Sequence, residues 1–223
     1  MVDIKLGGDA MEKSQATQGI LDVHKNTRYY DDAAQASAVA LFWEGNSAFL
    51  RMFRKLKCDF IVELAVGKGR HVPMYMDRAS KVVLVDALAE NVAACREMMG
   101  DSPKFQYYVN NGTDLSELPD ASFDSLFSYD AVVHFEMLDV WSYLKETARI
   151  LAPGGRALYH HSNYSAHPTH VWTQNPHNRN FMSDSIFEHL ADRAGLVVLE
   201  REAIHWGQIE NLDSLTLLEK PAG

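Results

Sequence analysis

Apolar runs alternate with segments of helix-spaced apolar residues from about residue 58 to the end of the chain. Runs rich in β-branched and aromatic residues fall at 60–64, 82–86, 105–109, 122–128, 156–161, 196–199 and 212–218. Such runs predict strands. Because helical patterns separate most of them, the sequence predicts an α/β fold with a doubly wound, mostly parallel sheet.

The segments between these runs predict helices with one buried face. Apolar residues recur three or four positions apart over 88–99, 141–151 and 186–194. Gly100 and Gly195 follow two of these patterns and Ser183 precedes the last, so we expect two glycine stops and a serine cap. The polar segment 162–182 has no apolar period and predicts a long functional loop.

The N-terminal residues have a different composition from the rest. Residues 1–26 are polar with scattered glycines and indicate a loosely ordered tail. Ala33 to Trp43 is alanine-rich and predicts a helix. Ser47 is placed to cap a second helix whose apolar residues extend to Leu56.

The end of the first strand is the most informative stretch. Glu63 stands near its tip, and Gly67 and Gly69 follow at alternate positions. Glycines there permit a tight turn, and the amides that open the next helix face a ligand with partial positive charge. The second strand ends at Asp86, roughly 20 residues on, which is the spacing of a ribose-binding carboxylate. Val72 stands where a dinucleotide fingerprint requires glycine, which disfavours a nicotinamide dehydrogenase.

The pattern Glu-x-Ala-x-Gly-x-Gly followed by Val-Val-Leu-Val-Asp resembles motifs I and II of the class I S-adenosylmethionine-dependent methyltransferases. The resemblance extends from about Cys58 to the end of the chain and departs at Ala65, where the family more often has glycine. It implies a seven-stranded sheet with an antiparallel C-terminal hairpin. It also implies an N-terminal tail and helical lid over residues 1–57 and a Rossmann-like core over 58–223, within one domain.

The same resemblance implies S-adenosylmethionine as cofactor, S-adenosylhomocysteine as product, and a set of contacts to them. These are Glu63, Ala65, Gly67 and Gly69 at the methionine part, Asp86 at the ribose, Ala87 against the adenine, Asp114 or Thr113 at the adenine amino group, and Asp130 at the methionine end or the acceptor. For Asp114 or Asp130 alone, a polar residue that simply ends a strand is the competing interpretation.

Two histidines are candidate bases for a hydroxyl acceptor, which benefits from losing its proton in the transition state. His134 follows the fourth strand, and several sugar O-methyltransferases that this region resembles have histidine at about this place. The alternative for His134 is an inert residue in the first turn of a helix. His161, at the tip of the fifth strand, is the second candidate. Its neighbour His160 points to the opposite face if the strand continues, so at most one of them faces the crevice.

Candidate acceptor contacts are Tyr30, His160, Asn163 and Arg179. The alternative for Tyr30 is packing of the N-terminal helix against the sheet. Arg179 suits an acceptor carboxylate or phosphate. The alternatives for Arg179 are a solvated loop residue or a hydrogen-bond donor that fixes the loop. The histidines between 160 and 177 match no zinc spacing and have no carboxylates among them, so no metal site is predicted.

Composition narrows the class of acceptor and the cellular compartment that we expect. The 223 residues carry a formal net charge of -9 and no basic stripe, which makes nucleic acid a poor partner. We find no secretory signal or membrane-spanning run, and Cys58 and Cys95 form no Cys-x-x-Cys. We therefore expect a cytoplasmic protein with reduced thiols that acts away from membranes. The oligomeric state is open.

These patterns predict a methyltransferase that acts on a polar small molecule. The His-, Asn- and Ser-rich loop favours O-methylation of a sugar-like, saccharide hydroxyl with His134 as the base. The near alternative is N-methylation of a small amine oriented by a carboxylate such as Asp130. An alternative from another class is a non-catalytic cofactor-binding sensor or partner subunit.

Overall fold

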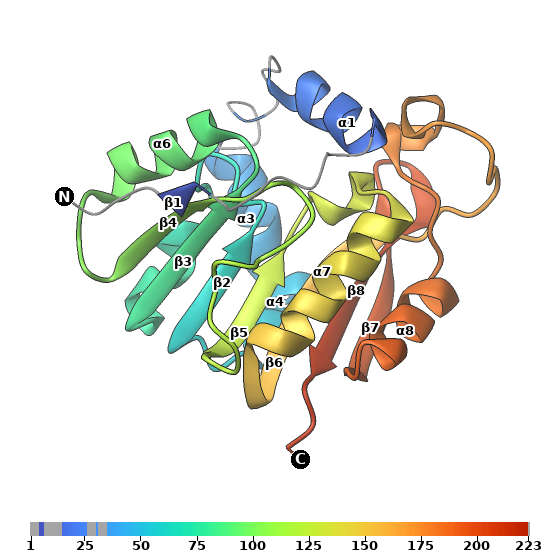
Figure 1. Ribbon diagram of the computed structural model, residues 1–223. Coiled ribbons are helices and arrows are strands. Elements are labelled where there is room, and N and C mark those ends of the chain that lie inside the picture. The colour runs from blue at the N-terminus through green and yellow to red at the C-terminus, as the bar shows by residue number, and fades with distance from the viewer. Residues whose placement is uncertain (1–4, 7–14, 26–29, 31–34, 223) are drawn as a thin grey trace.

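A sheet with helices on both faces forms the molecule, and its predicted strands are all present (Figure 1). The computed structural model describes residues 5–6, 15–25, 30 and 35–222. Its strands are β1 (Lys5–Leu6), β2 (Phe60–Leu64), β3 (Lys81–Asp86), β4 (Phe105–Val109), β5 (Phe123–Ser128), β6 (Leu151–Ser162), β7 (Val197–Trp206) and β8 (Ile209–Glu219).

The strand order is β1-β4-β3-β2-β5-β6-β8-β7. Strands from β1 to β6 pair in parallel, whereas β8 is antiparallel to both β6 and β7. The predicted doubly wound sheet and its antiparallel C-terminal hairpin are confirmed. The two-residue β1 adds an edge strand that the sequence pattern did not indicate.

The helices are α1 (Gln15–Lys25), α3 (Ala36–Trp43), α4 (Ala48–Phe53), α5 (Val72–Tyr75), α6 (Ala89–Met99), α7 (Met137–Ile150) and α8 (Asp184–Arg193), with single turns η1 (Met76–Arg78), η2 (Val132–His134), η3 (Trp172–Gln174) and η4 (Pro176–Asn178). The Ser47 hydroxyl accepts a hydrogen bond from the Leu50 amide at 3.1 Å, and Ser183 caps α8 in the same way. Both predicted serine caps are confirmed.

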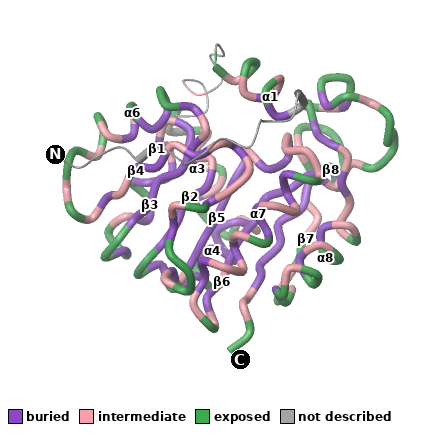
Figure 2. Tube along the Cα trace, viewed as in Figure 1, coloured by how far each residue is buried: buried purple, intermediate pink, exposed green. Residues whose placement is uncertain are grey.

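Alternation along the strands divides the core into two layers. On β2, Ile61 packs with α3 to α6, whereas Val62 packs with α7 and α8. The interior of the sheet is buried and the outer helix surfaces are exposed (Figure 2). Within the described residues, no helix is long and apolar enough to cross a membrane.

The N-terminal region differs from its prediction. Residues 15–25, expected in a loose tail, form the helix α1, which lies across the upper end of the sheet (Figure 1). Thr17 and Ile20 of α1 are buried. The predicted helices α3 and α4 instead pack onto the sheet face through Trp43, Phe49 and Phe53. Of these three helices, α1 contributes residues to the lining of the cleft described below.

Candidate active site

A cleft opens where the parallel strands end, below α1. Its lining comes from four successive loops, namely residues 64–68, 70 and 71 after β2, 86–88 after β3, 110 and 112 after β4, and 129–131, 134 and 135 after β5. Tyr30, four residues of α1, and Asp139 and Tyr143 of α7 complete it. Strand tips at one edge of a doubly wound sheet converge in this way, as the sequence predicted.

The glycine loop of the cleft depends on left-handed backbone. Ala65 has φ 56° and Gly67 has φ 58°. Only glycine adopts such angles without steric cost, which explains why glycine is more frequent in the family at position 65. A Cβ on Gly67 would lie 2.9 Å from the Tyr30 ring, so Gly67 also provides room for that side chain.

Asp86 connects this loop to β3. One carboxylate oxygen accepts the Gly67 amide at 2.9 Å, and the other accepts the Leu88 amide at 2.9 Å and the Asn91 side chain at 3.2 Å. Burial raises the pKa of Asp86 above the usual value for an aspartate, against the smaller lowering effect of these hydrogen bonds. A carboxylate has about four acceptor positions, so three donors leave one for a ligand hydroxyl.

Two predicted cofactor contacts, Glu63 and Gly69, are not among the residues that line the cleft. Glu63 is buried and accepts the Tyr75 hydroxyl at 2.7 Å. Burial raises its pKa to about 8, against the smaller lowering effect of that bond. A Cβ on Gly69 would lie 3.1 Å from the Cys95 sulfur. Both residues therefore support the loop through α5 and α6.

In the loop after β4, Asn110 and Gly112 line the cleft, while the predicted contacts Thr113 and Asp114 do not. The Asn111 side-chain oxygen accepts the amides of Thr113 at 2.8 Å and Asp114 at 3.0 Å, which turns the chain away from the cleft. A residue that sequence analysis missed, Asp139, lines the cleft and accepts the Thr17 hydroxyl of α1 at 2.7 Å. Its spacing of four residues from Tyr143 on α7 was the available signal.

A second cavity of about 240 Å³ adjoins the cleft and shares His24, Asp130 and His134 with it. The rest of its lining is Val23, His177, Asn178, Arg179 and Trp206. Asp130, His177 and Asn178 have φ of 57°, 47° and 57°. Such backbone costs about 1–2 kcal/mol for each non-glycine residue and accumulates at functional sites.

His134 is oriented by the long polar loop. Its Nδ1 lies 2.7 Å from the Asn178 carbonyl, which can only accept, so Nδ1 carries the proton and Nε2 carries the lone pair. The ring contacts those of His24 and Trp172, with centroids 5.2 Å and 5.7 Å away. Burial lowers the pKa of His134 to about 4, against a smaller raising effect of the bond to Asn178.

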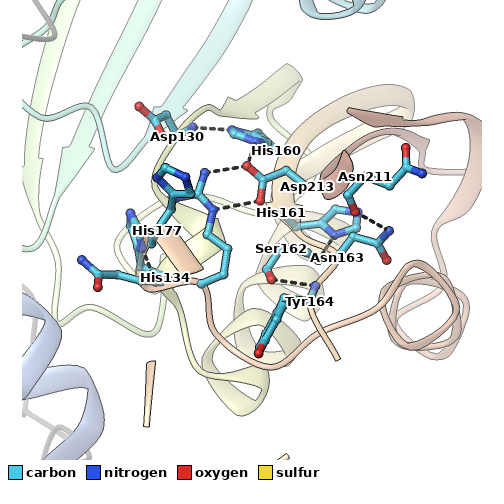
Figure 3. A network of polar contacts seen from close by, with 12 residues as sticks. Asp130, His134, His160, His161, Ser162, Asn163, Tyr164, His177, Asn211 and Asp213 are labelled. Carbon is cyan, nitrogen blue, oxygen red and sulfur yellow. Dashed lines mark hydrogen bonds and ion pairs between the residues drawn. The ribbon is translucent and has the colours of Figure 1, made fainter. Parts of the chain in front are cut away.

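A buried network connects the second cavity to the last strand (Figure 3). Arg179 donates from Nε and Nη2 to the two Asp213 oxygens at 2.9 Å and 2.5 Å. His160 accepts the Asp130 amide at Nδ1, 3.0 Å away, and therefore donates from Nε2 to Asp213 at 3.1 Å. Burial alone would raise the pKa of Asp213, but the bonds from His160 and Arg179 lower it to about 2. Sequence analysis did not single out Asp213, which lies on a strand far from the motifs.

Two further predicted site residues, His161 and Asn163, lie outside the linings of both cavities. His161 is buried away from the cleft, where it stacks on Phe187 at 3.8 Å and contacts the Thr216 hydroxyl at 2.9 Å. Asn163 donates to the Asn211 carbonyl and accepts the Asp184 amide, outside both cavities. His160 and His161 do face opposite sides of the sheet, as alternation predicted.

Residues 62–159 match a family model described as a methyltransferase domain. This part of the chain is therefore similar to methyltransferase domains. The match contains the glycine loop, Asp86 and His134, so the resemblance found in the sequence is confirmed there. A curated methyltransferase of Claviceps purpurea is 33% identical over 93 residues, which are 42% of this chain and 28% of that protein. The chain thus matches less than a third of the length of that relative.

Solved structures show the methyltransferase fold over nearly the whole chain. A S-adenosylmethionine-dependent methyltransferase of Leishmania major aligns with a TM-score of 0.73 and 13% identity, covering 96% of this chain and 87% of that one. The geranyl diphosphate C-methyltransferase of Streptomyces coelicolor aligns at 0.69 and 14%, covering 95% and 100%. The latter was solved with Mg²⁺, geranyl diphosphate and S-adenosylhomocysteine.

The donor set of the cleft fits S-adenosylmethionine. Asp86 retains one acceptor position, which would take a ribose hydroxyl beside the left-handed turn at Gly67. Ala87 and Leu88 are apolar lining residues that would lie against the adenine, and Leu64 and Ile20 of α1 belong to the same lining. Asp130 stands where the cleft meets the second cavity.

Proposed function

We propose that the chain is an S-adenosylmethionine-dependent methyltransferase that methylates a hydroxyl of a small polar acceptor, with His134 as general base. The observation that carries the proposal is the position of His134, whose imidazole lines both the cleft and the second cavity. The cleft then holds the cofactor, and the second cavity holds the acceptor. Its volume of about 240 Å³ suits an acceptor smaller than the drug-sized ligands that occupy pockets of about 300–1,000 Å³.

When bound, the cofactor supplies an activated methyl group and a neutral leaving group. The second cavity would hold the acceptor with its hydroxyl toward the cleft. As the methyl group exchanged its bond to sulfur for a bond to this oxygen, Nε2 of His134 would take the hydroxyl proton. Because the Asn178 carbonyl fixes the proton of His134 on Nδ1, Nε2 is available to receive it. The low pKa of the ring keeps it unprotonated at neutral pH, and makes it a weaker base than a histidine whose pKa lies near the operating pH.

The substitution His134→Gln tests this role. Glutamine keeps a polar side chain but cannot act as a base, so kcat should fall by about 10²–10⁴-fold for a hydroxyl acceptor. Binding of S-adenosylhomocysteine, measured by calorimetry, should remain within about threefold, since Gly67, Asp86 and Leu88, which would contact the cofactor, are unchanged. His189→Gln, on the exposed side of α8, is the matched control.

N-methylation of an amine is the competing proposal, because Asp130 also lines both cavities. The Asp130 carboxylate already pairs with Arg70 at 2.8 Å. An amine that binds as the free base needs no strong protein base. Unchanged kcat in His134→Gln would therefore reject the hydroxyl mechanism in favour of the amine.

A further inference from the structure

The lining of the second cavity contains Asp130 and Arg179, and each pairs with an oppositely charged side chain from outside that lining. The guanidinium of Arg179 and the carboxylate of Asp213 form a bidentate pair with side-chain exposures of 3% and 0%. Asp130 pairs with Arg70, whose own side chain points in from the glycine loop. The cavity thus presents charged residues without presenting net charge, although Arg179 alone would favour an anion.

The hydrogen-bonding groups that remain are of both kinds. Arg179 uses three of its five N–H groups on Asp213 and on the His177 carbonyl, which leaves two donors. The Trp206 ring covers one face of that guanidinium, with its centroid 4.8 Å away. Nε2 of His134 is an acceptor. His24 donates from Nδ1 to the Ile20 carbonyl at 2.8 Å, so in its neutral form Nε2 of His24 is an acceptor as well.

We propose that the second cavity selects an uncharged acceptor with at least two hydroxyls, and that Asp213 sets this preference by compensating Arg179; the proposal rests on the proposed function. Each hydroxyl both donates and accepts, so one can donate to a histidine Nε2 while taking a bond from Arg179. A carboxylate or phosphate only accepts, and would bring lone pairs against those of His24 and His134. Asp213 acts through Arg179 and is therefore a specificity-determining positioning residue.

The role of Asp213 is testable without knowing the acceptor, using inorganic phosphate as probe. We expect calorimetry to show no saturable phosphate binding by the wild-type protein in the millimolar range. Asp213→Asn removes the charge while keeping the shape, so the uncompensated Arg179 should bind phosphate at least about tenfold more tightly than wild type does. Adding Arg179→Gln to that variant should abolish the gain.

Thr216→Val is the matched control, because Thr216 is buried on the same strand but bonds His161 on the opposite face. It should bind no phosphate. Saturable phosphate binding by the wild-type protein that Arg179→Gln removes would overturn the inference in favour of an anionic acceptor. This measurement does not depend on whether an Asp213 variant folds. A folded Asp213→Asn protein without phosphate binding would overturn the compensation by Asp213.

A second measurement separates this inference from the proposed function. Release of S-adenosylhomocysteine is compared for methyl glucoside and glucuronate, which differ in charge. Turnover that favours the glucoside, and a shift of that ratio toward glucuronate in Asp213→Asn, supports the inference. Preference for glucuronate in wild type overturns it, even where His134→Gln still abolishes turnover and the proposed function stands. Phosphate binding confined to Asp213→Asn supports the inference whether or not either sugar reacts.

Discussion

Asp86 fixes the glycine loop and also keeps an acceptor position that would take a ligand hydroxyl. Its carboxylate fixes the Gly67 and Leu88 amides and retains one acceptor position. Glu63, also an acid at a strand end, has instead turned to Tyr75 beneath the loop. The sequence pattern predicts a ligand contact for both acids. Only their hydrogen-bond partners in the structure distinguish Asp86, which lines the cleft, from Glu63, which bonds the core residue Tyr75.

Asp86→Asn should weaken S-adenosylhomocysteine binding by roughly 10–100-fold, because an amide group cannot accept all of the present hydrogen bonds. Calorimetry measures the change. Asp101→Asn, which alters an exposed acid paired with Arg96, is the control. A loss of less than about threefold would mean that Asp86 does not contact the cofactor.

The raised pKa of Glu63 predicts a pH dependence of stability. A carboxyl whose pKa rises from 4.5 to about 8 on folding stabilises the fold fully below pH 4.5, and this contribution is lost as the pH rises through 8. Glu63→Gln has no such titration. The difference in free energy of unfolding between wild type and Glu63→Gln, measured in urea, should fall from pH 5 to pH 8. A constant difference would contradict a buried, protonated Glu63.

At the scale of elements, α1 is held in place by contacts with residues far from it in the sequence. Ile20 faces the cleft lining, and Thr17 bonds Asp139 of α7, 122 residues away. His24 reaches His134 and Trp172. An isolated helix of this length is marginal in water, so these tertiary contacts hold it.

Thr17→Val should loosen α1 over the cleft. The change keeps the side-chain shape but leaves the buried Asp139 without this donor, at a cost of about 1–2 kcal/mol. Dissociation of S-adenosylhomocysteine, followed by stopped-flow fluorescence, should accelerate by roughly fivefold to thirtyfold, since 1.4 kcal/mol is a factor of ten. Gln18→Ala, on the exposed side of the same helix, should leave the rate unchanged.

The elements that a local pattern specifies were predictable, and those that depend on the topology were not. The strands, the glycine turn, Asp86 and the caps at Ser47 and Ser183 each follow from residues close in sequence. The role of Asp213 depends on β8 lying beside β6, which places it against His160. The exclusion of Asp114 depends on one side chain, Asn111, that turns the loop. The positions of β1 and α1 follow from contacts with distant elements.

At the scale of the whole molecule, the buried His161 and the half-buried His134 set an acid limit to stability. Burial lowers the pKa of both His134 and His161 to about 4. A histidine whose pKa falls from 6.5 on folding contributes stability above pH 6.5, and loses it as the pH falls toward 4. The free energy of unfolding attributable to these groups should therefore decline between pH 6.5 and pH 4. His161→Asn should reduce this decline, measured by urea unfolding at pH 7 and pH 5, and an unreduced decline would assign it to other groups.

The sharing of His24, Asp130 and His134 between the cleft and the second cavity has a kinetic consequence. An acceptor seated against these residues closes off the methionine end of the cleft from that side. We therefore expect an ordered sequential mechanism, in which the methyl donor enters first and the demethylated cofactor departs last. Product inhibition by S-adenosylhomocysteine should be competitive with the donor and noncompetitive with the acceptor.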